Sequence, residues 1–295
     1  MKIIVIGSVK FSLEMLITLY EINAELVGVI TGLDTGFNAD YEDLEPFCRE
    51  KQIPCIKTNK INEQETVDWV MARKADVIFC LGWSRLIKSE ILQSTPLGVI
   101  GYHPAALPKN RGRHPLIWAL VLGLKETASS FFFMDEGADS GDILSQEIMS
   151  ILPEDDAKTL YSKMISTAKK QIETFLPELE NQTFKRVRQN HQLANTWRKR
   201  GKKDGEIDWR MSAESIYNLI RALTHPYVGS HFIFDGEEYQ VWKSRIVHIE
   251  GGCENIEPGK VLQVQDNSVI VKCGKGCIEL LEITPFPPLS YGVYL

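Results

Sequence analysis

Short, apolar, β-branched runs alternate with amphipathic helical stretches through residues 1–150, and this alternation limits the possible folds more than any other feature. The expected strands are Lys2–Ile6, Leu26–Thr31, Ile53–Lys57, Val77–Leu81, Val99–Tyr102, Ser129–Met134 and Ile143–Ser150. The expected helices between them are Ser12–Glu21, Asn62–Arg73 and Pro115–Gly123. Near-continuous apolar strands separated by helices are typical of a parallel sheet covered on both faces. We therefore predict an α/β protein with a doubly wound, Rossmann-like, mostly parallel sheet.

The rest of the chain follows a different pattern. A long helix, Asp155–Leu176, is expected to close the first domain, and the apolar spacing of Ala213–Leu223 predicts another helix. Short strands separated by Gly, Asp and Asn follow, at His231–Phe234, Tyr239–Ile246, Gly259–Gln265, Ser268–Lys272 and Gly276–Thr284. We predict an N-terminal domain over residues 1–177, a polar linker over 178–208, and a helix with a small all-β, barrel-like domain over 209–295.

Bulk properties narrow the class of function. The net charge is −6, whereas proteins that bind a phosphate backbone usually carry a basic face, so we do not expect a nucleic acid partner. The dense basic run Arg198–Lys203 fits a solvated linker, with contact to phosphate as the alternative. No apolar run reaches the roughly 18 residues of a membrane span. The N-terminus has the pattern of a first strand rather than a signal peptide, so we expect a cytoplasmic protein without a membrane partner.

Two common cofactor patterns are missing from the sequence. None of the six cysteines forms a CxxC pair, and no nearby histidine completes a zinc pattern at Cys273 and Cys277, so we predict free thiols and no metal site. Gly7 alone follows the first strand, where a dinucleotide-binding enzyme has GxGxxG. A nicotinamide enzyme is therefore not expected.

Two polar loops follow apolar strands and offer catalytic side chains. His103 comes directly after Val99–Tyr102, in a loop that three prolines stiffen. Asp139 lies in a turn between Gly137 and Gly141 that follows Ser129–Met134. Each loop alone is compatible with a purely structural role. Because both leave strand ends of one predicted sheet, they also fit a shared site.

These two loops carry the resemblance to a known family. The run Leu97–Gly112 resembles the signature of formyltransferases that use 10-formyltetrahydrofolate, roughly Asn-x-His-(Pro/Gly)-Ser-x-Leu-Pro-x-x-Arg-Gly. The run Met134–Leu144 is similar to the second motif of that family. Residues 204–209 and 216–227 resemble the stretch that joins the catalytic domain to a C-terminal barrel in relatives. The resemblance spans nearly the whole chain and implies formyl transfer from this folate co-substrate to an amine.

The resemblance also implies roles for individual residues. As catalytic residues, His103 would stabilise the oxyanion and move a proton, and Asp139 would orient His103. The implied cofactor-binding residues are Trp83, Ser84, Arg85, Leu86, Ile87, Gly137, Ala138 and Asp139. The implied substrate-binding residues are Tyr102, Pro104, Lys109, Asn110, Arg111, Arg113 and Tyr227.

One position departs from the family pattern. The asparagine two residues before the histidine, whose amide helps to hold the formyl oxygen in relatives, is Gly101 here. We expect an active enzyme with another donor, for which Asn110 and His114 are candidates. A slow enzyme and a protein that only binds remain alternatives.

The amine is predicted from a local likeness. The run Arg111–Trp118 is most similar to the branch that formylates amino sugars on nucleotide carriers, such as a 4-amino-4,6-dideoxyhexose. This likeness implies a role in O-antigen and lipopolysaccharide synthesis, with a nucleotide sugar and folate as small-molecule partners and a homodimer as the favoured assembly. The alternatives are formylation of methionyl-tRNA, and a non-catalytic relative that binds folate or nucleotide.

Overall fold

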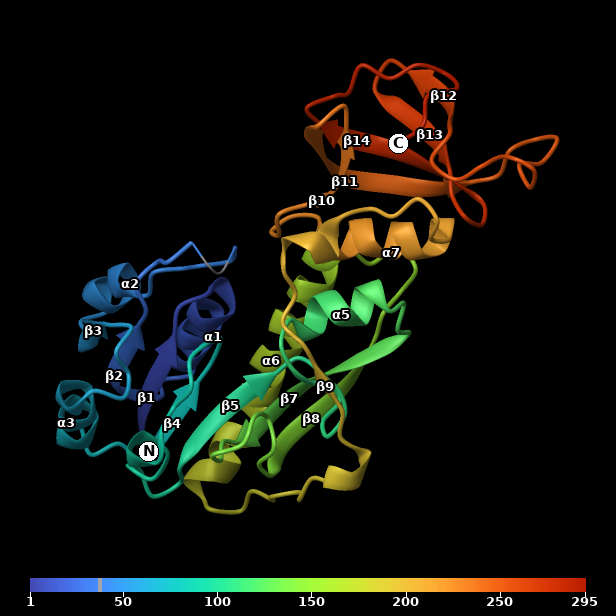
Figure 1. Ribbon diagram of the computed structural model, residues 1–295. Coiled ribbons are helices and arrows are strands. Elements are labelled where there is room, and N and C mark those ends of the chain that lie inside the picture. Colours follow the sequence, from blue (N-terminus) through green and yellow to red (C-terminus); the bar gives the residue numbers. More distant parts are fainter. Residues whose placement is uncertain (37–38) are drawn as a thin grey trace. The chain divides into compact units, whose positions relative to one another are not determined.

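The computed structural model describes residues 1–36 and 39–295, and its backbone divides into two compact units (Figure 1). Unit 1 comprises Met1–Pro115, Thr127–Met149 and Ser162–Trp197. Unit 2 comprises Leu116–Glu126, Ser150–Tyr161 and Arg198–Leu295.

Unit 1 is built on a seven-stranded sheet with the order β3-β2-β1-β4-β5-β7-β8. The strands are β1 (Lys2–Gly7), β2 (Glu25–Thr31), β3 (Cys55–Lys57), β4 (Val77–Cys80), β5 (Val99–His103), β7 (Glu126–Phe133) and β8 (Ile143–Ser150). Strands β1 to β5 pair in parallel, and β7 runs antiparallel to β5. Strands β2 and β3 are added on one side of β1, and β4 and β5 are added on the other side. The strand order therefore changes direction at β1. In such sheets ligands bind at the carboxyl ends of the strands near this switch point.

Apolar side chains on both faces of the sheet explain why it forms. Ile3, Ile4, Val5 and Ile6 of β1 are all fully buried, as the central strand of a covered parallel sheet requires. The helices of unit 1 are α1 (Lys10–Glu21), α2 (Glu45–Glu50), α3 (Gln64–Ala72), α4 (Ser89–Leu92) and, from Ser162 onward, α6 (Ala157–Glu180).

Helix α6 contributes aromatic and polar contacts to the core of unit 1. The ring centroid of Phe175 lies 6.1 Å from that of Phe79 on β4 and 5.0 Å from that of Phe131 on β7. The buried amide of Gln171 donates to the backbone carbonyl of Ser129 and to the hydroxyl of Ser145. These contacts fix β7 and β8, between which the Asp139 loop lies.

Unit 2 contains a five-stranded antiparallel sheet with the order β10-β11-β14-β13-β12. Its strands are β10 (Ser230–Phe234), β11 (Glu237–Val247), β12 (Val261–Gln265), β13 (Ser268–Lys272) and β14 (Cys277–Thr284), and its helices are α5 (Pro115–Val121, from Leu116 onward) and α7 (Ala213–Leu223). Ser212 begins α7 by accepting a hydrogen bond from the backbone N–H of Ser215. The buried side of α7 packs on β11 and β14.

The predicted fold class is confirmed: a mostly parallel α/β sheet is followed by an all-β domain. Most predicted elements agree with the structure to within three residues. The segment 178–208 differs from a simple linker, because its residues up to Trp197 pack as part of unit 1. Among the described residues, no helix combines the length and apolarity that crossing a membrane requires.

Replacing Arg221 of α7 with methionine is expected to destabilise unit 2. The buried Nη1 of Arg221 donates to the backbone carbonyls of Leu152, Pro153 and Asp155, at 3.1, 3.2 and 2.8 Å. Arg221→Met would leave these acceptors without a donor, at a cost of about 2–4 kcal/mol. Calorimetry would measure the fall in Tm, with the exposed Arg210→Met as the control that leaves Tm nearly unchanged. Equal Tm values for the two variants would contradict this account.

Candidate active site

The imidazole of His103 lies at the end of β5 and is almost completely buried, with 4% of the residue exposed. Its Nε2 lies 2.7 Å from the backbone carbonyl oxygen of Asn110. Because a carbonyl only accepts hydrogen bonds, Nε2 carries the proton, and Nδ1 of the neutral ring keeps its lone pair. One backbone carbonyl thus determines the tautomer of His103 and the orientation of its ring.

Asp139 faces the other nitrogen of this ring. Its Oδ2 lies 3.6 Å from His103 Nδ1 and accepts a hydrogen bond of 2.8 Å from the backbone N–H of Gly112. The distance of 3.6 Å is too long for a hydrogen bond, so Nδ1 stays available as a base. The Asp139 side chain is 21% exposed, against 5% for His103, so the carboxylate is the more accessible of the two groups. A proton taken up at Nδ1 is stabilised by this fixed negative charge.

The loop that carries Asp139 is shaped by local contacts. Asp135 Oδ1 accepts hydrogen bonds from the backbone N–H of Gly137 at 2.9 Å and from the hydroxyl of Ser140 at 2.6 Å. At Gly141 an added Cβ would lie 1.7 Å from the carbonyl oxygen of Phe133, so only glycine fits there. Asp139 itself has a φ of 54°. The turn therefore has little freedom to move its carboxylate.

A segment that we name the strap, Gln189–Trp197, joins the two functional loops. Gln189 is 3% exposed, and its Nε2 donates to the backbone carbonyls of Asp139 at 2.9 Å and Gly141 at 2.7 Å. Its Oε1 accepts from Arg111 Nη2 at 2.6 Å. The strap lies in the region predicted as a linker, where one glutamine among polar residues gives no sequence signal of burial.

The strap also pairs with the backbone of the His103 loop. The N–H of Asn110 donates to Asn195 Oδ1 at 2.9 Å, and the N–H of Arg111 donates to the Asn195 carbonyl at 3.0 Å. Strand β6 (Arg111–Gly112) then pairs in parallel with β9 (Thr196–Trp197). A Cβ at Gly112 would lie 2.3 Å from the carbonyl oxygen of Trp197. The strap thus sets the position of the Asn110 carbonyl that holds His103.

Arg111 has a structural position rather than an open one. It is buried, and its Nη2 donates to Gln189 and to His191 Nδ1, the latter at 3.1 Å. No carboxylate among the described residues pairs with this guanidinium. The predicted contact between Arg111 and substrate is not supported by this burial, because Arg111 holds the strap to the loop.

Tyr102 is not brought into the site. Side chains alternate along a strand, so Tyr102 of β5 faces away from His103. Its ring stacks on Phe11 at a centroid distance of 4.1 Å and meets the edge of Phe131 at 5.0 Å. Burial raises the pKa of its hydroxyl well above the usual range, and Ser129 donates a hydrogen bond to it. Tyr102 is half-buried and packs on Phe11 and Phe131, which does not support its predicted contact with substrate.

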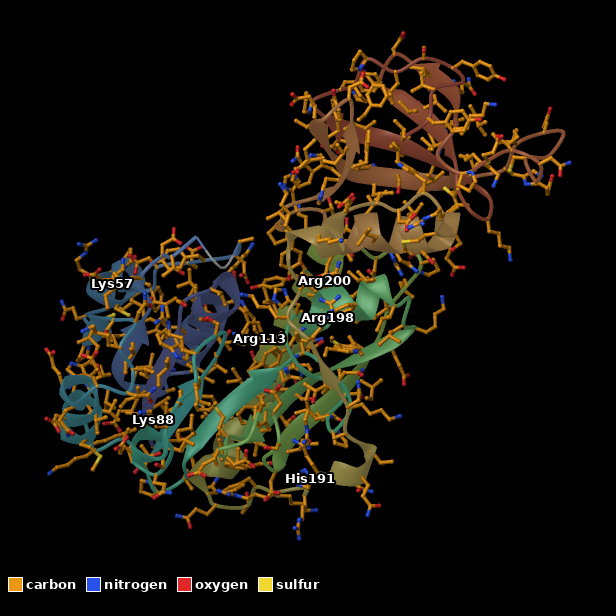
Figure 2. All side chains as sticks on the ribbon, viewed as in Figure 1. Lys57, Lys88, Arg113, His191, Arg198 and Arg200 are labelled. Carbon is orange, nitrogen blue, oxygen red and sulfur yellow. The ribbon has the colours of Figure 1, made fainter. Side chains whose placement is uncertain are left out.

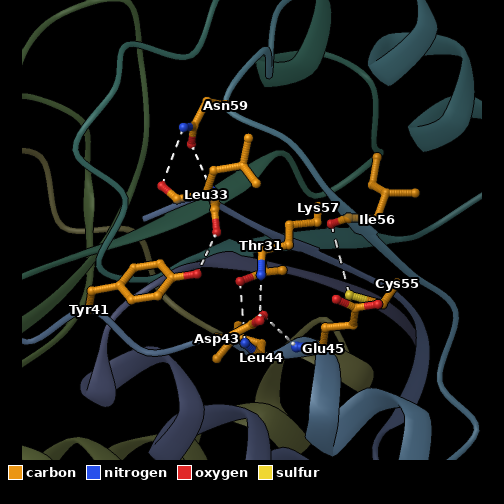
Figure 3. Close-up of polar contacts among 11 residues, drawn as sticks. Thr31, Leu33, Tyr41, Asp43, Leu44, Glu45, Cys55, Ile56, Lys57 and Asn59 are labelled. Atoms are coloured by element: carbon orange, nitrogen blue, oxygen red, sulfur yellow. Dashed lines mark hydrogen bonds and ion pairs between the residues drawn. The ribbon is translucent and has the colours of Figure 1, made fainter. Parts of the chain in front are cut away.

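A surface cavity lies beside the predicted cofactor segment. Its lining residues are Ser8, Leu33, Asp34, Thr35, Tyr41, Asn59, Trp83, Ser84 and Arg85. Figure 3 shows how one wall is held: Asn59 makes two hydrogen bonds with the backbone of Leu33, and the Tyr41 hydroxyl donates to the Gly32 carbonyl at 3.1 Å. The indole N–H of Trp83 is buried, with no hydrogen-bond partner among the described residues.

Two exposed arginines flank this segment. Arg85 Nη1 donates to the Asn59 carbonyl at 3.0 Å, and Arg113 Nη1, labelled in Figure 2, donates to the Ser84 carbonyl at 3.1 Å. Within residues 1–36 and 39–295, neither guanidinium forms an ion pair with a carboxylate. Both charges are thus available to an anionic ligand.

The dense basic run is mostly engaged in contacts within unit 2. Arg198 forms a bidentate pair with Asp204, which holds the pKa of that carboxyl well below its usual range. The guanidinium carbons of Arg198 and Arg200, both labelled in Figure 2, lie 5.3 and 4.6 Å from the ring centroid of Trp118. Lys202 pairs with Glu238. The basic side chains of the run other than Arg200 are solvent-exposed, as predicted, and Asp204 and Glu238 neutralise two of them.

The remaining predicted site residues differ in solvent exposure. Ile87 is buried in the core of unit 1, so its side chain cannot reach a ligand, whereas Leu86 is 70% exposed. Gly137 and Ala138 are exposed beside Asp139, and Lys109 is exposed in the His103 loop. The Pro104 carbonyl accepts from Thr127. Tyr227 belongs to unit 2, and its contact with substrate stays a prediction.

Gly101 is enclosed by neighbours. A Cβ at this position would lie 2.8 Å from Met134 Cγ, 3.1 Å from Met134 Sδ and 3.0 Å from Phe132 Cζ. The space that a side chain would need beside His103 is therefore filled by the adjoining strand and loop.

Comparisons with known proteins identify related sequences and folds. Residues 1–176 match the family model described as Formyl transferase, and residues 199–286 match Formyl transferase, C-terminal domain. A methionyl-tRNA formyltransferase of Caldanaerobacter subterraneus subsp. tengcongensis is 30% identical over 288 residues, which cover 96% of this chain and 92% of that protein.

Two solved structures share the fold. One is WlaRD, a sugar 3N-formyl transferase with dTDP and 5-N-formyl-THF, at a TM-score of 0.73 and 17% identity, covering 97% of this chain and 99% of the other. The other is an N-formyltransferase from Helicobacter canadensis with folinic acid and dTDP-3-aminofucose, at a TM-score of 0.72 and 17% identity, covering 96% and 99%.

Gln189→Leu is expected to loosen both functional loops. The substitution keeps the size of the side chain but leaves two buried carbonyls and the Arg111 guanidinium without their partner, at a cost of about 2–4 kcal/mol. A lower Tm and faster hydrogen exchange in residues 110–113 and 139–142 would be measured. The exposed Gln192→Leu serves as the control. Unchanged exchange in these loops would show that the strap does not hold them.

Proposed function

The chain belongs to the formyltransferase family, and on this premise we propose that it transfers the formyl group of 10-formyltetrahydrofolate to the primary amine of a nucleotide-linked amino sugar. One observation carries the proposal: His103 Nε2 lies 2.7 Å from the Asn110 carbonyl, so Nδ1 is the ring nitrogen that can accept a proton, and Nδ1 faces Asp139 at 3.6 Å. An attacking amine must lose a proton, and an imidazole nitrogen in this state accepts one.

The two catalytic residues divide the work. His103 Nδ1 takes the proton of the attacking amine and can return it to the leaving nitrogen. Asp139 stabilises the positive charge that the ring carries between these two events, and the Gly112 N–H keeps the carboxylate in place. Burial of the imidazole strengthens this electrostatic interaction because little water screens it.

The residues at the cavity suit the proposed co-substrate, which supplies an activated one-carbon group. Trp83, Ser84 and Arg85 line the cavity beyond the carboxyl end of β4, where backbone groups can meet a heterocycle rich in donors and acceptors. Arg85 offers a charge to the carboxylates of a folate tail. Leu86, Gly137 and Ala138 are open enough to contribute backbone contacts.

Charge supports a small nucleotide-linked amine over a transfer RNA. The described residues 32–36 and 39–44, which follow β2 at the carboxyl edge of the sheet, contain Asp34, Asp40, Glu42 and Asp43 and neither lysine nor arginine, and Asp43 among them pairs with Lys57. The net negative charge of these residues disfavours a phosphate backbone. The basic run at residues 198–203 does not compensate, because Asp204 and Glu238 occupy part of its charge.

A second candidate is formylation of methionyl-tRNA, which the name of the relative at 30% identity supports. A relative that binds folate or nucleotide without turnover is the remaining alternative, and the replacement at position 101 favours it. We infer further that the enzyme works in the cytoplasm, as a homodimer, and that its product enters O-antigen or related surface-polysaccharide synthesis.

The first experiment supplies purified protein with 10-formyltetrahydrofolate and a panel of dTDP-, UDP- and GDP-linked amino sugars. We expect release of tetrahydrofolate and the mass of one added formyl group with one member of the panel. His103→Ala should lower kcat by about 10²–10⁴-fold, because the base is lost. The exposed His248→Ala is the control and should keep wild-type kcat.

Two outcomes would redirect the proposal. Formylation of charged initiator tRNA in place of every sugar, with a KM that rises steeply with salt, would establish the tRNA candidate. Binding of folate or nucleotide without any turnover would establish a non-catalytic protein.

Arg113→Met is expected to raise the KM for the nucleotide sugar by about 10-fold with little change in kcat. The reason is that the Arg113 guanidinium has no carboxylate partner among the described residues and lies beside the Ser84 carbonyl. Steady-state kinetics with Arg210→Met as a control would measure the effect. An unchanged KM would remove Arg113 from the substrate site.

A further inference from the structure

The proposed reaction needs a hydrogen-bond donor that the catalytic pair does not supply. As an amine adds to the formyl carbon, the formyl oxygen gains negative charge, and a donor aimed at it lowers the barrier. His103 Nε2–H is already bonded to the Asn110 carbonyl at 2.7 Å, and Nδ1 serves as the base. Another group must therefore provide the N–H.

Position 101 cannot provide this donor. It lies two residues before His103 on β5, so its side chain would share the face of His103. Gly101 has no side chain, and Met134 and Phe132 occupy the space that an amide would need. The backbone of β5 pairs with β4 from Val99 to Gly101 and with β7 from Ile100 to His103.

The backbone of Asn110 lies next to His103, and this residue also carries a side-chain amide that is not committed to another contact among the described residues. Its backbone is held at both ends, since its N–H donates to Asn195 Oδ1 and its carbonyl accepts from His103. Its half-buried side-chain carboxamide has no hydrogen-bond partner among the described residues. The carboxamides of Gln189 and Asn195 are bonded already, and His114 also has an interaction partner. Asn110 thus combines a fixed backbone with two free N–H donors.

We propose that the side-chain amide of Asn110 is the donor that holds the formyl oxygen and stabilises the charge that develops on it. The inference rests on the proposed formyl transfer. In this chain the amide comes from the loop after β5 instead of from β5 itself. The carbonyl of Asn110 that orients His103 and the amide that contacts the formyl oxygen belong to one residue, so the base and the donor are positioned together.

A conformational role for Asn110 must be separated from this chemical one. Its φ is 62°, in the left-handed region that asparagine and glycine tolerate best. Asn110→Gly keeps this backbone conformation and removes the amide. Asn110→Asp keeps the shape of the side chain and removes both donors, and it is the second variant if the glycine variant does not fold.

The test is steady-state kinetics of both variants with the amine and folate that the wild-type protein uses. We expect kcat to fall by about 10²-fold or more in each variant, with both KM values within about threefold of wild type. Gln182→Gly, at an exposed position with a φ of 56°, is the matched control and should keep wild-type kcat.

The outcomes distinguish a failure of the proposed role of the Asn110 amide from a failure of the proposed formyl transfer. Wild-type kcat in folded Asn110→Gly would show that only the backbone conformation matters, and would overturn the role of the amide while formyl transfer stands. A fall in kcat for Asn110→Asp but not for Asn110→Gly would also overturn it, because the added charge alone would then be responsible. An absence of formyl transfer in the wild-type protein would instead refute the proposed function.

Discussion

One buried carboxamide, that of Gln189, holds the two functional loops in register. Its three hydrogen bonds reach the backbone of the Asp139 turn and the guanidinium of Arg111, which lies next to Asn110. Each loop follows a different strand of the same sheet, so without a third segment their separation would depend on loop flexibility. A side chain that is 3% exposed makes such contacts strong, because water does not compete for them. The geometry of His103 and Asp139 depends on this connection.

The chemistry then follows from which hydrogen-bonding groups are committed and which stay free. His103 Nε2 and the backbone carbonyls of Asp139 and Gly141 are committed to the protein, whereas His103 Nδ1, the Trp83 indole N–H and the Asn110 amide have no hydrogen-bond partner among the described residues. A buried polar group without a partner, such as the Trp83 indole N–H, lowers stability, whereas water can solvate the half-buried Asn110 side chain until a ligand replaces it. Their positions, on the carboxyl side of β4 and β5, coincide with the place where the strand order reverses.

Much of the fold could be predicted because it depends on local pattern. The buried run Ile3–Ile6, the helical spacing of Ala213–Leu223 and the glycine-rich turns each have a period or a composition that a single sequence displays. The sequence also identifies His103 and Asp139 as candidate site residues, because both follow apolar strands. The structure of residues 178–208 could not be predicted, because a polar residue has the same sequence pattern whether it is solvated or, like Gln189, buried and hydrogen-bonded.

The sequence by itself determined the alternation of strands and helices, the all-β ending, and the two loops that carry the catalytic pair, because these features depend on neighbours along the chain. Only the tertiary structure decided which side chains face the site. It packed Tyr102 on Phe11, placed Ile87 in the core, buried Arg111 against the strap, closed Gly101 with Met134, and left the Asn110 amide without a partner among the described residues. The physical reason is that burial and hydrogen-bond satisfaction depend on segments far apart in the sequence, whose contacts no local pattern records.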